Sequence, residues 1–547
     1  MSKNGYQWAR AGDVNAFFGL MLDNIAGLVL MVTLLVVPFQ FPVEFALAYM
    51  VPGTAIGVLV GDLLFFWQSF RYAKKTGKSN VTAMPLGLDT PSTIGMTLLV
   101  VGPAYKAALG EGLDTDAAAM QAWHIGICAL VIMGVIKGVL AFCSNWIHKV
   151  FPRAGLLGSL AAIALVLIAF NQLPELVASP IVGFASLAIV LATLIARNHL
   201  PFKIPGALGA VLMGCVIWYL LVGIEMAAGV ELVKQNAMGS VSWFPTGWLE
   251  AFRFEWVGAF SDTMGYLGYI IPFAVATVIG GIDCAESAAS VGDEFNTRDV
   301  IGIEAGATVL AAVCGGVIQT TPYIGHPAYK AMGGRAAYTL ATALFVGGAG
   351  LIGYFSLLFA VLPKTAVLPI LIFIGLEITA ASFLVTPRRH FGALAVAFLP
   401  AIAKLVSIIL IDRYGDVLDF SRVPDFLAEE LINLKAYIGV LAGGFILTSL
   451  IWASATAKMI DRKFGSAAIY FAIGGVLTMF GFMHSPLPGD KTFFPWQIKD
   501  AVFDGLPRKL VIEFAIAYLV MAVLMFLMGW LTTQTPVETD EDFEKLL

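Results

Sequence analysis

Four polar residues share one face of an apolar segment at residues 265–290. Asp283, Glu286, Ser287 and Ser290 follow the spacing i, i+3, i+4 and i+7, which a helix brings into one line. A carboxylate in hydrocarbon is costly unless it faces a cavity or a partner, so this face predicts a polar site. A carboxyl group in such a site readily takes up a proton, and Asp283 and Glu286 are predicted to bind one. The alternative for Glu286 is a position at the wet end of the segment.

The elements that carry these residues are predicted to span a membrane. Of 547 residues, 59% are hydrophobic and 13% are charged. The hydrophobic residues recur in runs of about 18 to 25, enough for a helix to cross a bilayer of about 30 Å. The chain has 32 basic and 37 acidic residues, a net charge of −5, and no long basic stretch, which excludes nucleic-acid binding.

Composition also limits the chemistry. Five cysteines without a CxxC pair and six histidines without ligand spacing predict neither a metal site nor a cofactor. The sequence has no GxxxxGK[ST] motif, which disfavours an ATP-driven pump. We therefore expect a protein that is not an enzyme, and a proton is the expected coupling ion.

The expected fold is all-α and multi-pass, in the plasma (inner) membrane. Basic residues gather in breaks on one side of the membrane, which places both termini in the cytoplasm by the positive-inside rule. The first residues lack the features of a signal peptide. The apolar runs predict helices near residues 13–37, 44–67, 84–104, 123–146, 153–171, 178–197, 204–224, 265–290, 300–316, 320–334, 336–358, 365–385, 391–412, 435–456, 466–484 and 511–532.

Turn residues interrupt the third and the tenth of these runs. Each contains Thr-Pro followed shortly by Ile-Gly, at Thr90-Pro91 and at Thr321-Pro322. A hydroxyl residue as N-cap and a proline in the first turn start helices, so each run predicts an extended stretch leading into a short helix. The alternative is that proline and glycine merely kink two continuous helices.

The position of the interrupted runs predicts an internal repeat. Seven runs precede a long break, seven follow it up to Trp452, and the interrupted run is third in each set. An odd number of spans inverts the second set, so the sequence predicts a 7+7 inverted repeat, which is typical of secondary transporters. The predicted parts are a first repeat at 1–224, an extracytoplasmic linker at 225–262, a second repeat at 263–456, and two additional transmembrane helices with an acidic cytoplasmic tail at 457–547.

Three short motifs resemble the nucleobase:cation symporter-2 superfamily, above all its adenine/guanine/hypoxanthine and xanthine/uracil permease branches. Residues 320–335, TTPYIGHPAYKAMGGR, are similar without a gap to the family pattern TTxY[IV]ESxxGxxxGGR. FPRAGLLGS at 151–159 and PLGLD at 85–89 resemble two further family motifs, and the order of spans is similar over about residues 13–456. The resemblance implies the nucleobase/ascorbate transporter fold, in which a core domain moves against a gate domain. It assigns the spans within 13–146 and 265–358 to the core, and those within 153–224 and 365–456 to the gate.

The resemblance also implies site residues. The family's acid on the eighth span corresponds to Asp283, with Glu286 as the alternative in a loose register. Its glutamate on the tenth span, which grips the base, corresponds to Gly325, and the next family position to His326. The alternative for His326 is a residue that caps or packs within a helix turn. The predicted substrate site comprises Asn24, Asp89, Thr90, Asp283, Glu286, Ser287, Thr320, Thr321, Tyr323, Gly325 and His326.

We therefore predict a proton-coupled, elevator-type symporter that carries a nucleobase or related planar heterocycle across a lipid bilayer. Because Gly325 replaces the family's acid, the alternative is a carrier of a small organic or inorganic anion, which facing helix N-termini favour. A channel or a non-transporting membrane scaffold is a third hypothesis. A homodimer is compatible with the sequence, which does not fix the oligomeric state.

Other polar residues within the spans carry weaker predictions. Asp62 is expected near the cytoplasmic surface, and Lys137 is expected to extend its ammonium group toward a membrane surface. Glu377 and Lys404 are expected to form an ion pair between neighbouring spans of the gate.

Overall fold

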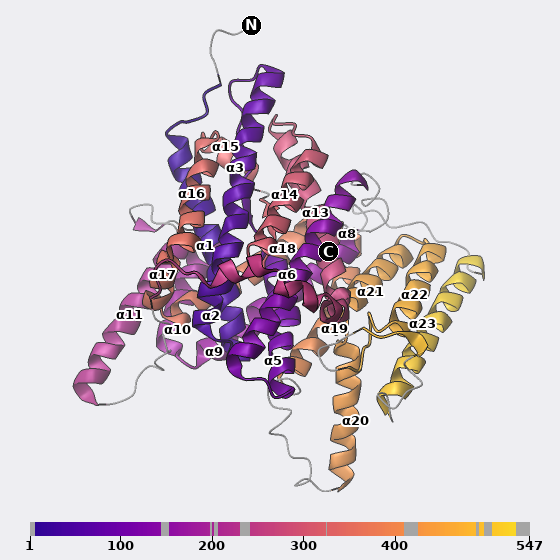
Figure 1. Cartoon of the computed structure of the whole chain (residues 1–547). Coiled ribbons are helices and arrows are strands. Elements are labelled where there is room, and N and C mark those ends of the chain that lie inside the picture. Colours follow the sequence, from indigo (N-terminus) through magenta and orange to yellow (C-terminus); the bar gives the residue numbers. More distant parts are fainter. Residues whose placement is uncertain are drawn as a thin grey trace. The chain divides into compact units, whose positions relative to one another are not determined.

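The computed structural model is a helical protein organised as two units (Figure 1). It describes residues 6–143, 153–196, 198, 200–201, 206–229, 241–323, 325–409, 425–487, 492–496 and 506–531. Within these residues, nine helices are long and apolar enough to cross a membrane, and the bent pair α20–α21 would make ten. Unit 1 comprises Met1–Lys149 and Met238–Val361, and unit 2 comprises Val150–Ala237 and Leu362–Leu547. This division confirms the predicted partition into a core and a gate.

Unit 1 contains the same order of elements twice: two helices, a short strand with a short helix, and a further helix. Its α1 and α3 pack on α16, and Figure 1 shows them side by side. The first set is α1 (Gly12–Phe39), α2 (Val43–Phe45), α3 (Val51–Thr76), β1 (Leu86–Leu88), α4 (Thr90–Gly95), α5 (Gly102–Gly110) and α6 (Thr115–Leu140). The second set is α12 (Phe260–Thr263), α13 (Leu267–Ser290), α14 (Thr297–Val313), β2 (Thr320–Pro322), α15 (His326–Ala331), α16 (Ala337–Ile352) and α17 (Tyr354–Val361).

The two interrupted runs meet in an antiparallel pair of strands. Leu86, Gly87 and Leu88 of β1 lie opposite Pro322, Thr321 and Thr320 of β2, respectively. Non-helical backbone is tolerated at membrane depth only where protein groups satisfy its hydrogen bonds, and each strand supplies them for the other. The opposite strand directions agree with an inverted second repeat. The predicted extended stretches and the 7+7 inverted repeat are therefore confirmed.

The starts of the short helices differ in detail from the prediction. The N-cap of α4 is Asp89, not Thr90, and its carboxylate accepts a hydrogen bond from the Ser92 amide. Pro91 lies in the first turn, as expected, but Pro322 ends β2 and does not start a helix. Proline lacks the N–H that a ladder needs, so it is tolerated at a strand end. The helix α15 begins four residues later, at His326.

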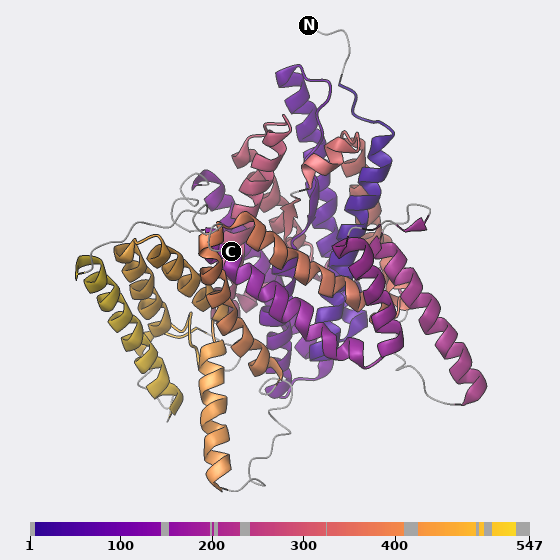
Figure 2. The same ribbon diagram turned by 180° about the vertical axis from the view of Figure 1, so that it is seen from behind.

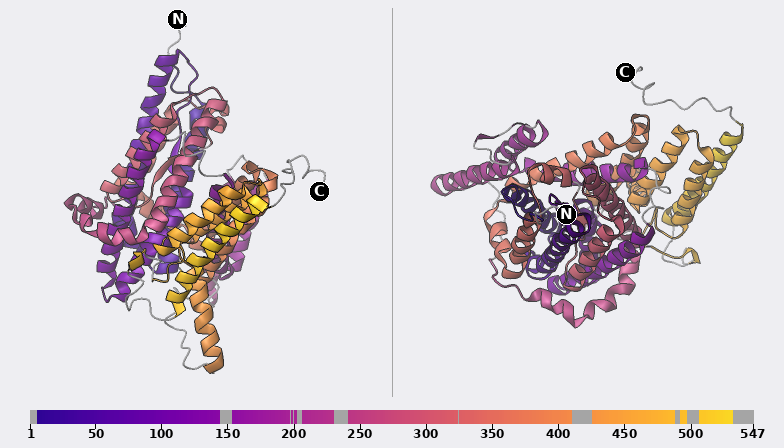
Figure 3. Two further views of the ribbon diagram at one scale, coloured as in Figure 1. Left: turned by 90° about the vertical axis from the view of Figure 1, so that its right-hand side faces the viewer. Right: turned by 90° about the horizontal axis from the view of Figure 1, so that it is seen from above.

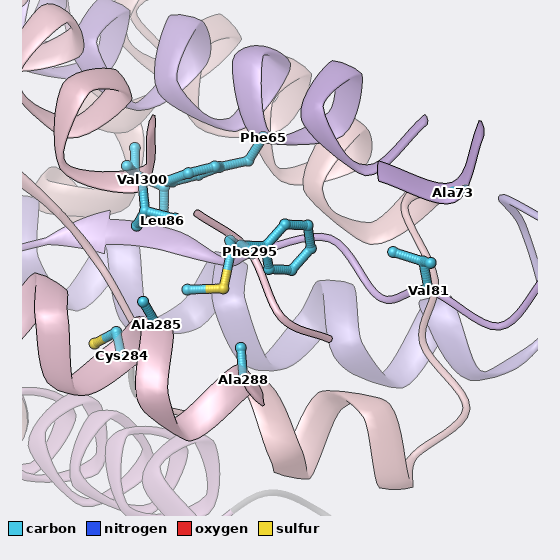
Figure 4. Close-up of a cluster of buried hydrophobic side chains, with 10 residues drawn as sticks. Phe65, Ala73, Val81, Leu86, Cys284, Ala285, Ala288, Phe295 and Val300 are labelled. Carbon is cyan, nitrogen blue, oxygen red and sulfur yellow. The ribbon is translucent and has the colours of Figure 1, made fainter. Parts of the chain in front are cut away.

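A buried apolar cluster fixes β1 against the helices around it (Figure 4). Phe65 from α3, Leu86 from β1, Ala285 from α13 and Val300 from α14 belong to it, each with 2% or less of its surface exposed. Side chains from four elements thus converge on the strand, and burial of the apolar surface holds it in place.

Unit 2 consists of helices. They are α8 (Arg153–Ala162), α9 (Asn171–Val177), α10 (Pro180–Val190), α11 (Gly206–Ala228), α18 (Lys364–Val385), α19 (Phe391–Ser407), α20 (Asp425–Ala442), α21 (Phe445–Ile460), α22 (Phe464–Met479) and α23 (Leu506–Leu531). The stretch Ile163–Phe170, in π-helical geometry, joins α8 to α9. The predicted boundaries of the four domain parts stay predictions.

The predicted single span at 435–456 is wrong. Two helices, Glu429–Ala442 and Phe445–Ile460, meet there with a bend of 69° (Figure 2). Gly444 lies between them with φ of 64°, a left-handed conformation that glycine adopts without strain and that ends a helix. Hydropathy alone predicts one continuous helix here, but the glycine pair Gly443-Gly444 ends the first helix within the apolar run.

Of the two additional C-terminal helices, α22 packs on α21 and α23 packs on α22, and one buried apolar cluster joins all three (Figure 3). Trp452 of α21 donates its indole N–H to the Tyr518 hydroxyl of α23 over 2.8 Å. His484 Nε2 lies 2.8 Å from the same hydroxyl. These helices therefore belong to unit 2. Residues 532–547, which include the acidic tail, and Phe151 and Pro152 of the second family motif lie outside the described residues.

The predicted ion pair between Glu377 and Lys404 is wrong. Glu377 of α18 is exposed, whereas Lys404 of α19 is buried, and no ion pair between them exists in the described part of the chain. Hydropathy gives the depth of a residue in a span but not the direction in which its side chain points.

Candidate functional site

The candidate site lies where β1 pairs with β2 within unit 1, at the start of α4. The Asp89 amide donates to the Gln319 carbonyl oxygen over 3.1 Å, and the Asp89 carboxylate accepts from the Ser92 amide over 2.8 Å. Gln319 Nε2 lies 3.5 Å from Asp89 Oδ2. The positive end of the helix that starts at Thr90 is thus occupied by the chain's own carboxylate.

Side chains from α1 and α3 satisfy the outer edge of β1. Asp62 Oδ1 accepts the Leu86 amide over 3.1 Å, and Asn24 Nδ2 donates to the Leu86 carbonyl oxygen over 3.2 Å. Both side chains are fully buried. The expectation that Asp62 lies near the cytoplasmic surface is therefore wrong, because the residue serves as the acceptor that the strand edge requires.

Asn24 and its neighbour Asp23 lie close to the middle of β1. A side chain at Gly87 would place its Cβ 3.2 Å from Asp23 Oδ2 and 3.9 Å from Asn24 Oδ1. Glycine at position 87 therefore lets polar groups of α1 approach the strand backbone. Asp23 is partly buried, so a second carboxyl group lies beside the β1–β2 pair.

A buried ion pair lies on the other side of β2. Lys137 Nζ of α6 is 2.6 Å from Glu304 Oε1 of α14, and both side chains are fully buried. The same nitrogen donates to the Thr320 carbonyl oxygen, to Gln319 Oε1 and to Thr308 Oγ1 over 2.9, 3.1 and 3.3 Å. The expectation that Lys137 reaches a membrane surface is wrong, because four oxygen atoms hold its ammonium group in the interior.

The four residues of the polar face predicted on α13 differ in how far they are exposed to solvent. Asp283 and Ser287 are partly buried, whereas Glu286 and Ser290 are exposed. Between them, Cys284 points its thiol at the Pro322 carbonyl oxygen over 3.2 Å. Cys284 thus contacts β2 from a different side of the helix than the predicted face, and the roles of Asp283, Glu286 and Ser287 stay predictions.

The residues of the second interrupted run lie in three different settings. Thr320 is fully buried, Thr321 is partly buried, and Tyr323 keeps 38% of its surface exposed. A side chain at Gly325 would collide with the Tyr323 ring. The position that carries a glutamate in the resembled family is therefore filled by an aromatic ring, and no carboxylate can stand there without moving it.

His326 binds a carboxylate in the turn between α13 and α14. Its Nε2 lies 3.0 Å from Asp293 Oδ2, which also accepts from Lys330 Nζ over 2.7 Å and from the Thr82 amide over 3.1 Å. Burial acts to raise the pKa of Asp293, but the hydrogen bonds from His326, Lys330 and Thr82 outweigh it and leave the pKa below its usual value. His326 is fully buried and engaged in this cluster, which fits its alternative as a packing residue.

Sequence reasoning missed Glu304, Gln319 and Thr308 as parts of the site. A signal was present, because Glu304 interrupts the apolar segment IGIEAGATVL and Gln319 directly precedes the Thr-Thr-Pro motif. A lone acid on one span and a lone lysine on another indicate a buried pair. Their partnership could not be read from the sequence because Lys137 and Glu304 are 167 positions apart.

No protein-family model and no curated protein matches this chain. The solved structures that are similar to it include the following three. The transmembrane domain of the bicarbonate transporter BicA of a cyanobacterium is 15% identical, with 72% of this chain and 96% of that chain covered and a TM-score of 0.41. A structure of SLC26A9 is 14% identical over 73% of this chain and 64% of that chain, with a TM-score of 0.46. The murine SLC26A9 anion transporter in the inward-facing state is 15% identical over 76% and 69%, with a TM-score of 0.48. Similarity at this level assigns neither a family nor a solute to this chain.

Proposed function

We propose that this chain is a multi-pass secondary transporter that carries a small solute together with a proton through an elevator-type motion of unit 1. The observation that carries the proposal is the antiparallel pairing of two interrupted spans, one from each repeat, within one unit. Discontinuous helices in inverted repeats place substrate and ion sites in the membrane interior. The channel and the scaffold are disfavoured because neither needs a second repeat that mirrors the first.

Proton coupling follows from the charges around the strands. The carboxyl groups of Asp23, Asp62, Asp89 and Glu304 border β1 and β2, and the ammonium of Lys137 neutralises one of them. Uncompensated carboxylates at membrane depth are costly, so the site favours uptake of protons. Asp283, partly buried on α13, remains our candidate for the transported proton, with exposed Glu286 as the comparison.

We propose a small organic or inorganic anion as the solute. Gly325 and the Tyr323 ring leave no carboxylate at the position that would hold the N–H edge of a base. The amide of Ser92 at the start of α4 is an anion-binding group that Asp89 occupies in this structure. A proton on Asp89 weakens its hold on that amide and lets a solute with negative charge replace it, which links proton and anion binding.

A nucleobase or related heterocycle is the second candidate, favoured by the family-like motif at residues 320–335. The two candidates are separated by a ligand panel. Purified protein is heated with bases, ureides, carboxylates and inorganic anions, and the solutes that raise Tm are then tested in proteoliposomes. Saturable uptake of an anion driven by an inward proton gradient supports the proposal. Stabilisation by bases alone would support the second candidate, and uptake without saturation would indicate a channel. A homodimer and cytoplasmic termini stay predictions.

The proton link is tested at Asp89. We expect Asp89→Asn, which keeps the oxygen acceptor but not the charge, to bind the anion with an affinity that depends less steeply on pH than that of the wild type, since only Asp283 then links a proton to the solute. Glu286→Gln is the matched control, because it removes an exposed carboxylate from the same unit. A pH dependence in Asp89→Asn as steep as that of the wild type would contradict the assignment, and so would a loss of pH dependence in Glu286→Gln.

A further inference from the structure

The buried lysine of α6 has the surroundings of a bound metal cation. Around Lys137 Nζ lie a carboxylate oxygen of Glu304, the carbonyl oxygen of Thr320, the amide oxygen of Gln319 and the hydroxyl of Thr308, at 2.6 to 3.3 Å. All five side chains are fully buried. A ring of oxygen ligands that includes a carboxylate and a backbone carbonyl is the set that hard metal cations take in proteins.

The ligands come from two elements, and the lysine comes from a third, α6. Glu304 and Thr308 are one turn apart on α14, whereas Gln319 and Thr320 belong to the segment that forms β2. Gln319 orients its amide so that the oxygen faces Lys137 and the nitrogen faces Asp89. The cation therefore ties α6, α14 and β2 together and sets the position of the group that contacts the α4 N-cap.

The cage holds one ammonium group, and one carboxylate balances its charge. Gly281 of α13 packs against the far side of Glu304, where a Cβ would lie 2.7 Å from Oε2. An ammonium has three N–H donors and four acceptors surround it, so each N–H of Lys137 has an oxygen partner. The carboxylate and the ammonium neutralise each other, and removing one alone strands a buried charge.

We infer that Lys137 is a built-in cation: its ammonium fills an oxygen-lined cage between α6, α14 and β2 that a dissolved monovalent cation would otherwise occupy. The inference goes beyond the proposed function, because it concerns what holds β2 and not what is carried. Since the charge belongs to the chain, β2 stays attached whichever cations surround the protein. Shortening the lysine should convert this permanent cation into an exchangeable one.

The test compares two ways of removing the ammonium in the full-length protein. Lys137→Ala empties the cage, whereas Lys137→Met fills most of the same volume with an uncharged chain. Thermal unfolding is measured for both variants and the wild type in choline chloride, with NaCl, KCl or methylammonium chloride replacing it at constant ionic strength. None of these salts depends on knowing the solute, so failure of this test is distinct from failure of the proposed function.

We expect the wild type to show the same Tm in every salt. Lys137→Ala should be less stable in choline and should regain Tm saturably with Na⁺, K⁺ or methylammonium, by about 5 °C when the cation is at 100 times its Kd. Lys137→Met should be destabilised and should not respond. The inference is overturned if Lys137→Ala shows no cation-specific gain, if Lys137→Met gains equally, or if the wild type responds as the alanine variant does.

A variant that removes both charges guards against misfolding. Lys137→Ala/Glu304→Gln leaves a neutral cage, so we expect folded protein that is indifferent to the salt. If Lys137→Ala yields no folded protein in any salt while the double variant folds, the inference is wrong, since an intact cage should have recruited a cation. If neither folds, Lys137→Arg decides by its folded yield in membranes. A yield above that of Lys137→Met supports a need for the charge, and an equal yield contradicts it.

Discussion

The edge of β1 offers a sharp test of how the interrupted span is held. Asp62 Oδ1 is the acceptor for the Leu86 amide, and the described residues place no donor on its Oδ2. Asp62→Leu removes the acceptor and leaves a buried N–H unsatisfied, whereas Asp62→Asn keeps an oxygen in the same place. A buried donor without a partner costs about 1 to 3 kcal/mol, and a neutral hydrogen bond retained should cost well under that.

The expected magnitude is therefore a difference between two variants. Taking about 2 kcal/mol for the lost acceptor, Asp62→Leu should raise the unfolding equilibrium constant about 30-fold, and Asp62→Asn by less than about fivefold. Equilibrium unfolding of the purified protein in mixed micelles measures both. The control is Thr342→Val, because Thr342 is buried but bonds only the Tyr338 carbonyl oxygen of its own helix.

A second change separates the hydrogen bond from the charge. Asn24→Leu removes the donor to the Leu86 carbonyl oxygen and should also cost about 1 to 3 kcal/mol. Because Asn24 and Asp62 serve one residue, the two losses should not add fully in the double variant. The reasoning is refuted if Asp62→Asn is as damaging as Asp62→Leu, since the charge and not the acceptor would then matter.

Three further results are expected. Gly95→Ala should lower Tm because the new Cβ would collide with the Phe273 ring, and overpacking of this kind typically costs about 1 to 3 kcal/mol. Adding Phe273→Leu should recover part of the lost Tm, and no recovery would contradict the contact. The pKa of Asp293 is lower in the folded state than in the unfolded chain, where it is about 4, so the ionised carboxylate stabilises the fold fully above about pH 4 and this stabilisation is lost as pH falls through the folded pKa. We therefore expect Asp293→Asn to have a lower Tm than the wild type at neutral pH and this difference in Tm to narrow below about pH 4. A Tm difference that stays constant from pH 3 to 7 would contradict the prediction. Asp283→Asn should keep solute binding but abolish proton-driven accumulation in liposomes, whereas Glu286→Gln should retain it; undiminished accumulation by Asp283→Asn would exclude Asp283 as the proton carrier.

The sequence predicted what local chemistry determines. The two Thr-Pro pairs, Thr90-Pro91 and Thr321-Pro322, each followed shortly by Ile-Gly, marked both interruptions correctly. The exact helix starts were less accessible. Asp89 outcompeted Thr90 as N-cap since its carboxylate reaches the Ser92 amide, and Pro322 was drawn into β2 by a partner strand that no local pattern reveals.

The polar site was harder to predict because its members are distant in sequence. A lysine in an apolar span is consistent with either an end that reaches water or a buried acid, and only Glu304 decides between them for Lys137. Glu377 and Lys404 did not pair, because the direction of a side chain around its helix depends on neighbours. Long-range partners, not composition, thus determine which intramembrane charges meet.

The interleaving of the two units imposes an order on biosynthesis. Lys137 and Gln319 are 182 residues apart, so at a translation rate of about 5 to 20 residues per second the lysine waits about 10 to 40 s for its ligand. During that interval Lys137 and the side of β1 that pairs with β2 have been made, whereas Glu304, Gln319 and β2 are still unmade or on the ribosome. The nascent first repeat must therefore be sheltered by the insertion machinery or by membrane chaperones. A ribosome that stalls before α14 would release a fragment with unpaired polar groups in the bilayer, which marks it for proteolysis.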